Sequence, residues 1–101
     1  MPVDLISTGP VHAAGSLLLA HGAGVDSQSP FMQAMADGLA KLDWRVHRFD
    51  FPYMVRRRLT GKKTPPDRPD VLLRAFKDAV DQVDQGRPLV IGGKSMGGRI
   101  A

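Results

Sequence analysis

The stretch "GGKSMGG", residues 92–98, contains a serine, Ser95, that two different chemistries could use. In the first, Gly-Lys-Ser ends a nucleotide-binding P-loop and the serine hydroxyl coordinates Mg²⁺. In the second, Gly93, Ser95 and Gly97 form a G-x-S-x-G motif, in which the serine is a nucleophile on a sharp turn between a strand and a helix. The residues around the motif discriminate between these two chemistries.

The P-loop alternative fails at one position. A P-loop requires a glycine five residues before its final glycine, because that first glycine begins the turn whose N–H groups surround the phosphates. Pro88 stands at this position, and proline has a fixed φ and no N–H. The second alternative has what it needs, since the apolar run "LVI" precedes the motif as a buried strand and "GGRIA" follows it as a helix start. Gly93 and Gly97 are then expected where backbones approach closely.

A serine nucleophile needs a base, a carboxylate that orients the base, and two N–H donors for the oxyanion. The N–H of Met96, directly after the nucleophile, is the first expected donor. The second is expected in "HGAG", His21 to Gly24, which follows the aliphatic run "LLLA" and so begins at the end of a predicted strand.

Strand and helix patterns alternate along the chain. Ser29 and Pro30 predict a helix start, and "WRVHRFDFP" predicts a strand. The predicted elements are a strand at 17–20, a helix at 30–42 with an apolar stripe of Phe31, Met35, Leu39 and Leu42, a strand at 44–49, an exposed loop at 53–70, a helix at 70–86, a strand at 87–93 and a helix start at 99–101. Such alternation predicts an α/β fold with a mostly parallel sheet and flanking helices.

Composition limits the class of protein. The chain has 101 residues, of which 43% are hydrophobic, so it is one globular domain or part of one. It has no cysteine, which excludes disulfides, zinc-thiolate sites and a cysteine nucleophile. The first ten residues lack the basic and apolar regions of a signal peptide, and the longest aliphatic run is far too short for a membrane span. These features predict a cytoplasmic protein without a membrane partner.

The net charge of +4 comes from one segment, residues 56–68, which has six basic residues and one acid. Two interpretations remain open for this segment. It is either a solvated surface loop kept extended by prolines, or a lid whose positive charge attracts anionic substrates. Nucleic acid is not expected as a partner, because aromatic residues other than Tyr53 do not alternate with the charges.

The stretches "LLLAHGAG", "SPFMQAMADGLA", "RFDFPYM" and "VIGGKSMGGRIA" together resemble the N-terminal half of an α/β-hydrolase. Within that superfamily the chain resembles compact bacterial proteins near the dienelactone hydrolases, related to testis-expressed hydrolase-like proteins and to the hydrolase-like subunit of the non-specific lethal complex. The resemblance begins at about Leu17 and leaves an N-terminal arm, residues 1–15, outside a hydrolase part at 16–101.

The resemblance implies specific roles for the residues of the two motifs. Ser95 would be the nucleophile, and the backbone amides of Ala23 and Met96 would form the oxyanion hole. The shape of the turn and of the oxyanion loop would depend on His21, Gly22, Gly24, Gly93 and Gly97. A serine, where dienelactone hydrolases have a cysteine, implies ester, thioester or peptide-like acyl substrates, and no metal or organic cofactor is required.

One feature departs from the family pattern. In α/β-hydrolases the acid and the histidine follow the nucleophile in chain order, whereas the six residues after Ser95 contain neither. The chain is therefore expected to be an inactive, C-terminally truncated piece that exposes an apolar sheet edge and lacks both triad partners. A hydrolase-fold scaffold without catalytic activity is the alternative function.

The histidines and aspartates that are present are not expected to replace the missing partners. His21 lies in the oxyanion loop, where the resemblance implies a shaping role, while His47 lies in a strand and His12 in the arm. Asp26 and Asp50 are expected in turns or at helix caps.

Overall fold

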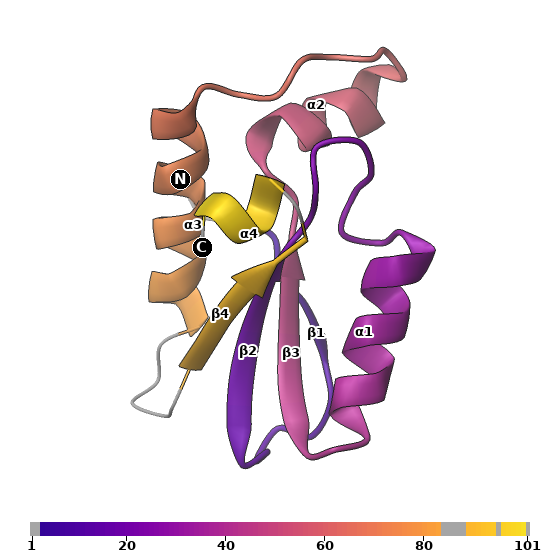
Figure 1. The fold of residues 1–101 in the computed structure, drawn as a ribbon, viewed down its shortest axis with the longest axis vertical. Coiled ribbons are helices and arrows are strands. Elements are labelled where there is room, and N and C mark those ends of the chain that lie inside the picture. Colours follow the sequence, from indigo (N-terminus) through magenta and orange to yellow (C-terminus); the bar gives the residue numbers. More distant parts are fainter. Residues whose placement is uncertain (1–2, 84–88, 95, 101) are drawn as a thin grey trace.

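The computed structural model describes residues 3–83, 89–94 and 96–100, which form a four-stranded sheet with helices on both faces (Figure 1). The strands are β1 (Ile6–Thr8), β2 (Gly15–Ala20), β3 (Trp44–Phe49) and β4 (Leu89–Gly93), and the helices are α1 (Pro30–Ala40), α2 (Pro52–Thr60), α3 (Pro69–Val83) and α4 (Met96–Ile100). The predicted α/β fold with a mostly parallel sheet is confirmed.

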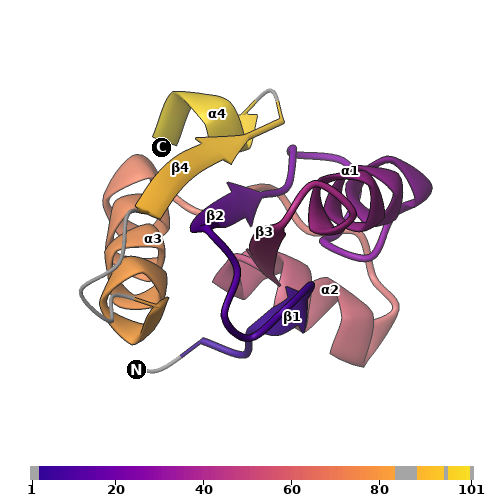
Figure 2. The same ribbon diagram turned by 90° about the horizontal axis from the view of Figure 1, so that it is seen from below.

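The strand order is β1-β3-β2-β4, and Figure 2 shows β4 at one edge and β1 at the other. β2 pairs in parallel with β3 and with β4, so that Leu18 lies between His47 and Ile91. β1 pairs antiparallel with β3. Because β2, β3 and β4 are parallel, the loops that follow them meet at the same edge of the sheet, where ligands bind in open α/β folds.

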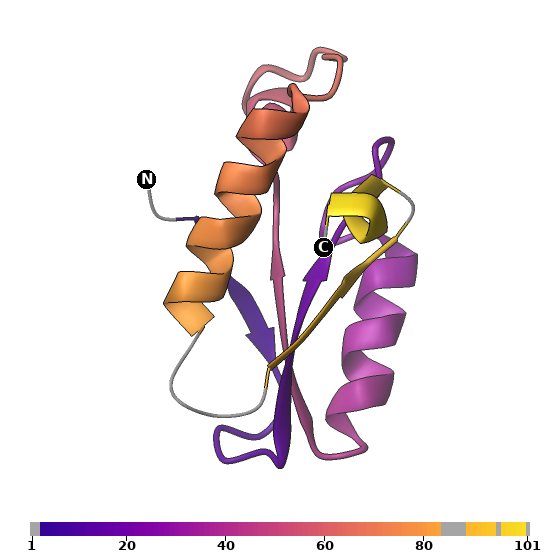
Figure 3. The same ribbon diagram turned by 60° about the vertical axis from the view of Figure 1, so that its left-hand side comes forward.

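The alternation of side chains along β2 and β3 builds two cores, one on each face of the sheet. Leu18, Ala20 and Phe49 pack with α2 and α3. Leu19 and Val46 lie on the opposite face and pack with α1. Figure 3 shows the sheet between α3 on one side and α1 on the other. Both faces of the central strands are thus covered, which accounts for the apolar run Leu17–Ala20 in β2.

Most predicted elements agree with the structure. α1 begins at Pro30 after the cap Ser29, whose Oγ accepts from the Met32 N–H at 3.4 Å, and β3 has the predicted bounds. α3 begins one residue before its predicted range and β4 lies within its own, although the expected helix end near Gly86 lies outside the described residues. Residues 1–15, expected to be an arm, contain the unpredicted strand β1.

The predicted apolar stripe of α1 is largely wrong, since Leu39 alone of its four residues packs against the core beside the sheet. Phe31, Met35 and Leu42 are exposed, and the side chains buried against the sheet are Met32 and Ala36. Both faces of the helix are apolar enough to be buried, so the amphipathic pattern does not decide between them. The small side chain of Ala36 allows close approach to β3, and this docking selects the face that is buried.

The predicted loop at 53–70 is also wrong in its first half, which forms α2. Pro52 suits the first helical position, and Gly61 ends the helix at φ 69° with its N–H donating to Arg57 O at 2.8 Å. Asp67, which follows α2 in the sequence, caps the N-terminus of the helix: its Oδ2 accepts from the Tyr53 N–H at 2.8 Å. The prolines that suggested an extended loop come after this helix, and only the remainder, residues 61–68, is irregular.

The β4 strand lies at the sheet edge and exposes apolar side chains. Val90 is 50% exposed and Ile91 is 44% exposed. This agrees with the expectation of an apolar edge.

In the described ranges 3–83, 89–94 and 96–100, no helix has the length and apolar character needed to cross a bilayer.

Candidate active site at the strand-to-helix turn

A sharp turn connects β4 to α4. The Lys94 N–H donates to Ala20 O at 3.0 Å, so the pairing with β2 continues one residue beyond the end of β4. Helix α4 begins only two residues later, and the Gly97 N–H donates back to Lys94 O at 3.0 Å. Ser95, the predicted nucleophile, lies between these residues and outside the described part of the chain. The segments on both sides of it form the predicted strand-to-helix junction.

Two glycines make this turn possible through close approach of backbones. A Cβ on Gly93 would lie 2.5 Å from the carbonyl carbon of Gly97. A Cβ on Gly97 would lie 2.8 Å from Ala20 O and would also collide with His21 O. Side chains cannot occupy such positions without a shift of the backbone, so Gly93 and Gly97 are required by the packing of the turn.

The contact between Gly97 and His21 brings the two predicted motifs together. The loop of residues 21–24, which we call the HGAG loop, follows β2 at the same sheet edge as the turn. Ala23 and Met96, the predicted oxyanion-hole residues, therefore belong to two neighbouring segments (Figure 1). A Cβ on Gly24 would meet no atom within 4 Å, so packing does not require a glycine there.

His21 is completely buried and holds the HGAG loop. Its Nε2 accepts from the Phe51 N–H at 3.0 Å, and its Nδ1 lies 2.5 Å from Gly22 O. Because the amide can only donate and the carbonyl can only accept, the ring is neutral with its proton on Nδ1. Burial lowers the pKa of His21. With both nitrogens occupied, His21 is a structural residue here, as expected, and not a free base.

Tyr53 and Arg57 of α2 also bind the HGAG loop, which sequence reasoning missed. The Tyr53 hydroxyl donates to Ala23 O at 3.0 Å, and the Arg57 guanidinium donates to Gly24 O at 3.3 Å. The position of Tyr53 shortly after β3, at the sheet edge that carries the loop, was the one signal in the sequence. It was not usable without the knowledge that residues 52–60 form a helix.

The aspartates near the turn have the structural roles that were expected. Asp50 Oδ1 accepts from the Ser27 N–H at 2.8 Å, and its other oxygen pairs with Arg58. Asp26 Oδ1 accepts from the Gln28 N–H at 3.0 Å, as in an Asx turn. Both carboxylates therefore order the segment that leads from the HGAG loop into α1.

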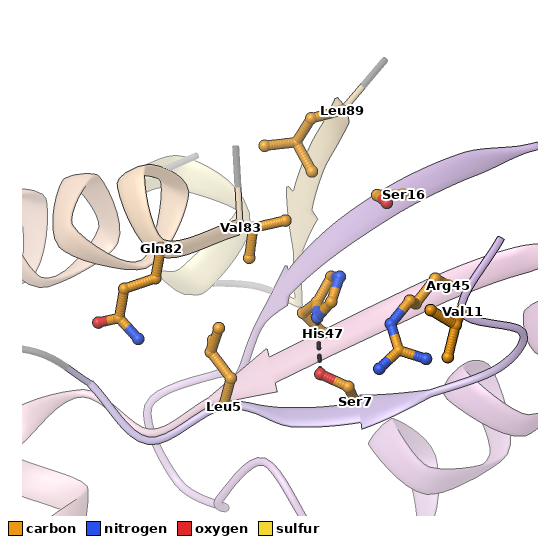
Figure 4. Close-up of a pocket in the computed structure, with 9 residues that line it drawn as sticks. All are labelled: Leu5, Ser7, Val11, Ser16, Arg45, His47, Gln82, Val83 and Leu89. Carbon is orange, nitrogen blue, oxygen red and sulfur yellow. Dashed lines mark hydrogen bonds between the residues drawn. The ribbon is translucent and has the colours of Figure 1, made fainter. Parts of the chain in front are cut away.

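The other two histidines lie away from the turn. His47 lines a cavity of about 270 Å³ toward the start of the parallel strands, where its Nδ1 lies 2.7 Å from Ser7 Oγ (Figure 4). The apolar part of the cavity wall is formed by Leu5, Val83 and Leu89. His12 is exposed in the connection between β1 and β2. The structure does not bring either ring to the strand-to-helix junction.

The arginines of the basic segment are engaged with the protein. Arg56 pairs with Asp67 at 2.7 Å, Arg58 with Asp50, and Arg68 with Asp70 at 3.2 Å. Asp67 belongs to the basic segment itself, while Asp50 and Asp70 lie outside it and offset part of its positive charge. Lys62 and Lys63 are exposed beside them.

Within the described ranges, His, Asp and Glu side chains do not gather in groups of three that could hold a metal ion.

Mild acid is expected to destabilise the protein through its buried histidines. Burial lowers the pKa of His21, and burial together with the Arg45 charge lowers the pKa of His47. The unfolded chain therefore binds more protons than the folded one below about pH 6.5. Stability present above that pH should fall as the pH decreases, by at most about 1.4 kcal/mol per pH unit for each histidine.

Urea unfolding of the complete gene product between pH 7.5 and 5 measures this dependence. His47→Asn keeps a polar group next to Ser7 but cannot titrate, so it should reduce the slope. A free energy of unfolding that rises as the pH falls through this window would contradict the assignment.

Comparison with known proteins agrees with the fold. The family model described as an alpha/beta hydrolase domain matches residues 13–101. A search of curated proteins finds no match. The matched region includes the three parallel strands, the HGAG loop and the strand-to-helix junction. The chain therefore belongs to the alpha/beta hydrolase domain family.

Proposed function

We propose that this chain carries the nucleophile and the oxyanion hole of a serine acyl hydrolase. Ser95 Oγ attacks the carbonyl carbon of an acyl substrate, and the amides of Ala23 and Met96 donate to the oxygen that becomes negative. The observation that carries the proposal is the close packing of Gly97 against the backbone of His21, which joins the G-x-S-x-G turn to the HGAG loop.

The catalytic step requires groups on two sides of the substrate. Attack by the hydroxyl forms the bond from Ser95 Oγ to the carbonyl carbon, and the serine proton passes to a base. The carbonyl π electrons move to the oxygen, which two amides can stabilise if they point at one location. The loss of one such donor typically costs about 10²–10³ in rate. Ala23 and Met96 lie on adjacent segments, which supports their joint role.

The base and its carboxylate are assigned to residues after Ser95 in chain order, as the family pattern implies. Residues 96–101 contain neither a histidine nor an acid. The histidines within residues 3–83 are bonded elsewhere or lie away from the turn, which supports this assignment. The proposal therefore concerns a protein that supplies both groups, and activity is not expected of residues 1–101 alone.

The substrate class follows from the nucleophile. A serine nucleophile favours ester, thioester or peptide-like acyl substrates, in a cytoplasmic enzyme of the compact bacterial group near the dienelactone hydrolases. No metal or organic cofactor takes part in the proposed step. The exposed Lys62 and Lys63 are the residues that would attract an anionic substrate, because the neighbouring arginines bind acids or carbonyl oxygens of the protein.

The experiment is labelling of the complete gene product with a fluorophosphonate probe, which reacts with activated serines. We expect labelling at Ser95 and its complete loss in Ser95→Ala. Ser7→Ala is the matched control, since Ser7 is the serine that contacts a histidine elsewhere in the fold, and it should be labelled as the wild type is. A folded wild-type protein without labelling would instead support the alternative function, a hydrolase-fold scaffold.

A further inference from the structure

We infer that Tyr53 is a positioning residue that fixes the direction of the Ala23 N–H through the opposite side of the HGAG loop, with Arg57 as a second support. This inference rests on the proposed function, because it concerns the oxyanion hole of that reaction. It adds two residues of α2 that neither the G-x-S-x-G motif nor the HGAG motif contains.

The Tyr53 hydroxyl shares its single proton between two consecutive carbonyls of the loop, with Ala23 O the nearer acceptor. It lies 3.0 Å from Ala23 O and 3.4 Å from Gly22 O. The Tyr53 side chain is completely buried, and its ring meets the His21 ring edge-on with 5.9 Å between centroids. A buried ring in close packing cannot swing away, so the hydroxyl is held at a fixed place beneath the loop.

These contacts determine where the Ala23 amide points. Gly22 O and the Ala23 N–H belong to the same planar, trans peptide unit, in which C=O and N–H point in opposite directions. Gly22 O is held by His21 Nδ1 and by the Tyr53 hydroxyl. The Ala23 N–H must therefore point away from Tyr53 and α2. A donor fixed in this way does not need to reorient when the negative charge develops.

Arg57 extends the same support to the end of the loop. Its guanidinium donates to Gly24 O at 3.3 Å and to Thr64 O at 2.7 Å, and it lies 5.7 Å from the centre of the Tyr53 ring. One residue thus connects the HGAG loop to the irregular segment that follows α2. Three consecutive carbonyls, from Gly22 to Gly24, accept hydrogen bonds from side chains.

The chemistry of the tyrosine suits a permanent donor. Burial raises the pKa of Tyr53, so its hydroxyl keeps its proton near neutral pH. The backbone of Tyr53 is itself held, since its N–H donates to Asp67 Oδ2 at 2.8 Å. The position of the loop therefore depends on a connected set of contacts from Asp67 through Tyr53 to Ala23.

The test is Tyr53→Phe in the complete gene product, which removes the hydroxyl and keeps the ring. We expect kcat for p-nitrophenyl acetate to fall by about 10-fold or more with little change in KM, because displacement of an oxyanion donor affects the transition state selectively. Hydrogen exchange of the peptide that contains residues 22–24 should become faster. Arg57→Gln should produce a smaller change in the same direction.

Arg68→Gln is the matched control for Arg57→Gln. It removes the same charge from the same basic segment, but the Arg68 side chain is 82% exposed and pairs with Asp70. It should leave kcat and loop exchange as in the wild type. Should Tyr53→Phe fail to fold, Arg57→Gln and its control test whether the contacts from α2 to the HGAG loop are needed for turnover.

The outcomes separate this inference from the proposed function. An active wild type whose Tyr53→Phe variant keeps its kcat would overturn the positioning role and leave the serine mechanism intact. An equal fall in kcat for Arg57→Gln and Arg68→Gln would overturn the support from Arg57 in favour of a charge effect. A folded wild type that neither hydrolyses the ester nor reacts with the fluorophosphonate would overturn the proposed function and this role together.

Discussion

Gly97→Ala should lower the rate of fluorophosphonate labelling of the complete gene product, and its kcat for an ester, by about 100-fold. The added methyl group would collide with His21 O and lie 2.8 Å from Ala20 O. Both are backbone atoms at the end of β2, so α4 must move away from the HGAG loop to make room. A displacement of about 1 Å between groups that act together costs on the order of 10²-fold in rate.

Gly92→Ala is the matched control for this substitution. It lies in the same glycine-rich stretch, but its Cβ would have Leu17 Cδ1 at 4.0 Å as its nearest neighbour, an ordinary contact. We expect labelling and turnover close to those of the wild type. If Gly97→Ala reacts as fast as Gly92→Ala, the close packing of the turn against the HGAG loop is not what the chemistry requires.

Asp67→Ala should lower the free energy of unfolding by about 2 kcal/mol, because it removes the cap of α2. The Asp67 side chain is only 7% exposed, and its Oδ2 accepts from the Tyr53 N–H at the start of the helix. The N-cap residue, Phe51, has an apolar side chain and makes no cap hydrogen bond, so it cannot replace this acceptor. Without Asp67, the buried Tyr53 N–H loses its partner and Arg56 loses its ion pair.

Urea unfolding of the complete gene product measures this effect, and hydrogen exchange shows whether it is located in α2. Asp70→Ala is the control, since Asp70 is also an acid paired with an arginine but its side chain is 62% exposed. Its substitution should change the free energy of unfolding by no more than about 0.5 kcal/mol. Equal destabilisation by the two variants would show that loss of a negative charge, and not loss of the cap, is the cause.

The part of the site that could be predicted is the part encoded by local sequence. The spacing of Gly93 and Gly97 around Ser95 predicted a tight turn, and the structure has the required close contacts at both glycines. The role of His21 in shaping its loop was likewise predicted, and its two hydrogen bonds agree with it. The contribution of Tyr53 was not predictable, because its hydroxyl binds carbonyls some 30 residues earlier in the chain.

The fold, like the site, has features that local sequence predicts and features that depend on tertiary contacts. The sequence by itself determined the alternation of strands and helices, the bounds of β3 and the start of α1, because hydrophobic period, caps and turn residues act between near neighbours. Only the tertiary structure decided that 52–60 is a helix, that β1 joins β3 and that Met32 and Ala36 face the sheet. Those outcomes depend on contacts such as that of Asp67 with Tyr53, and contacts between distant residues exist only after the chain has folded.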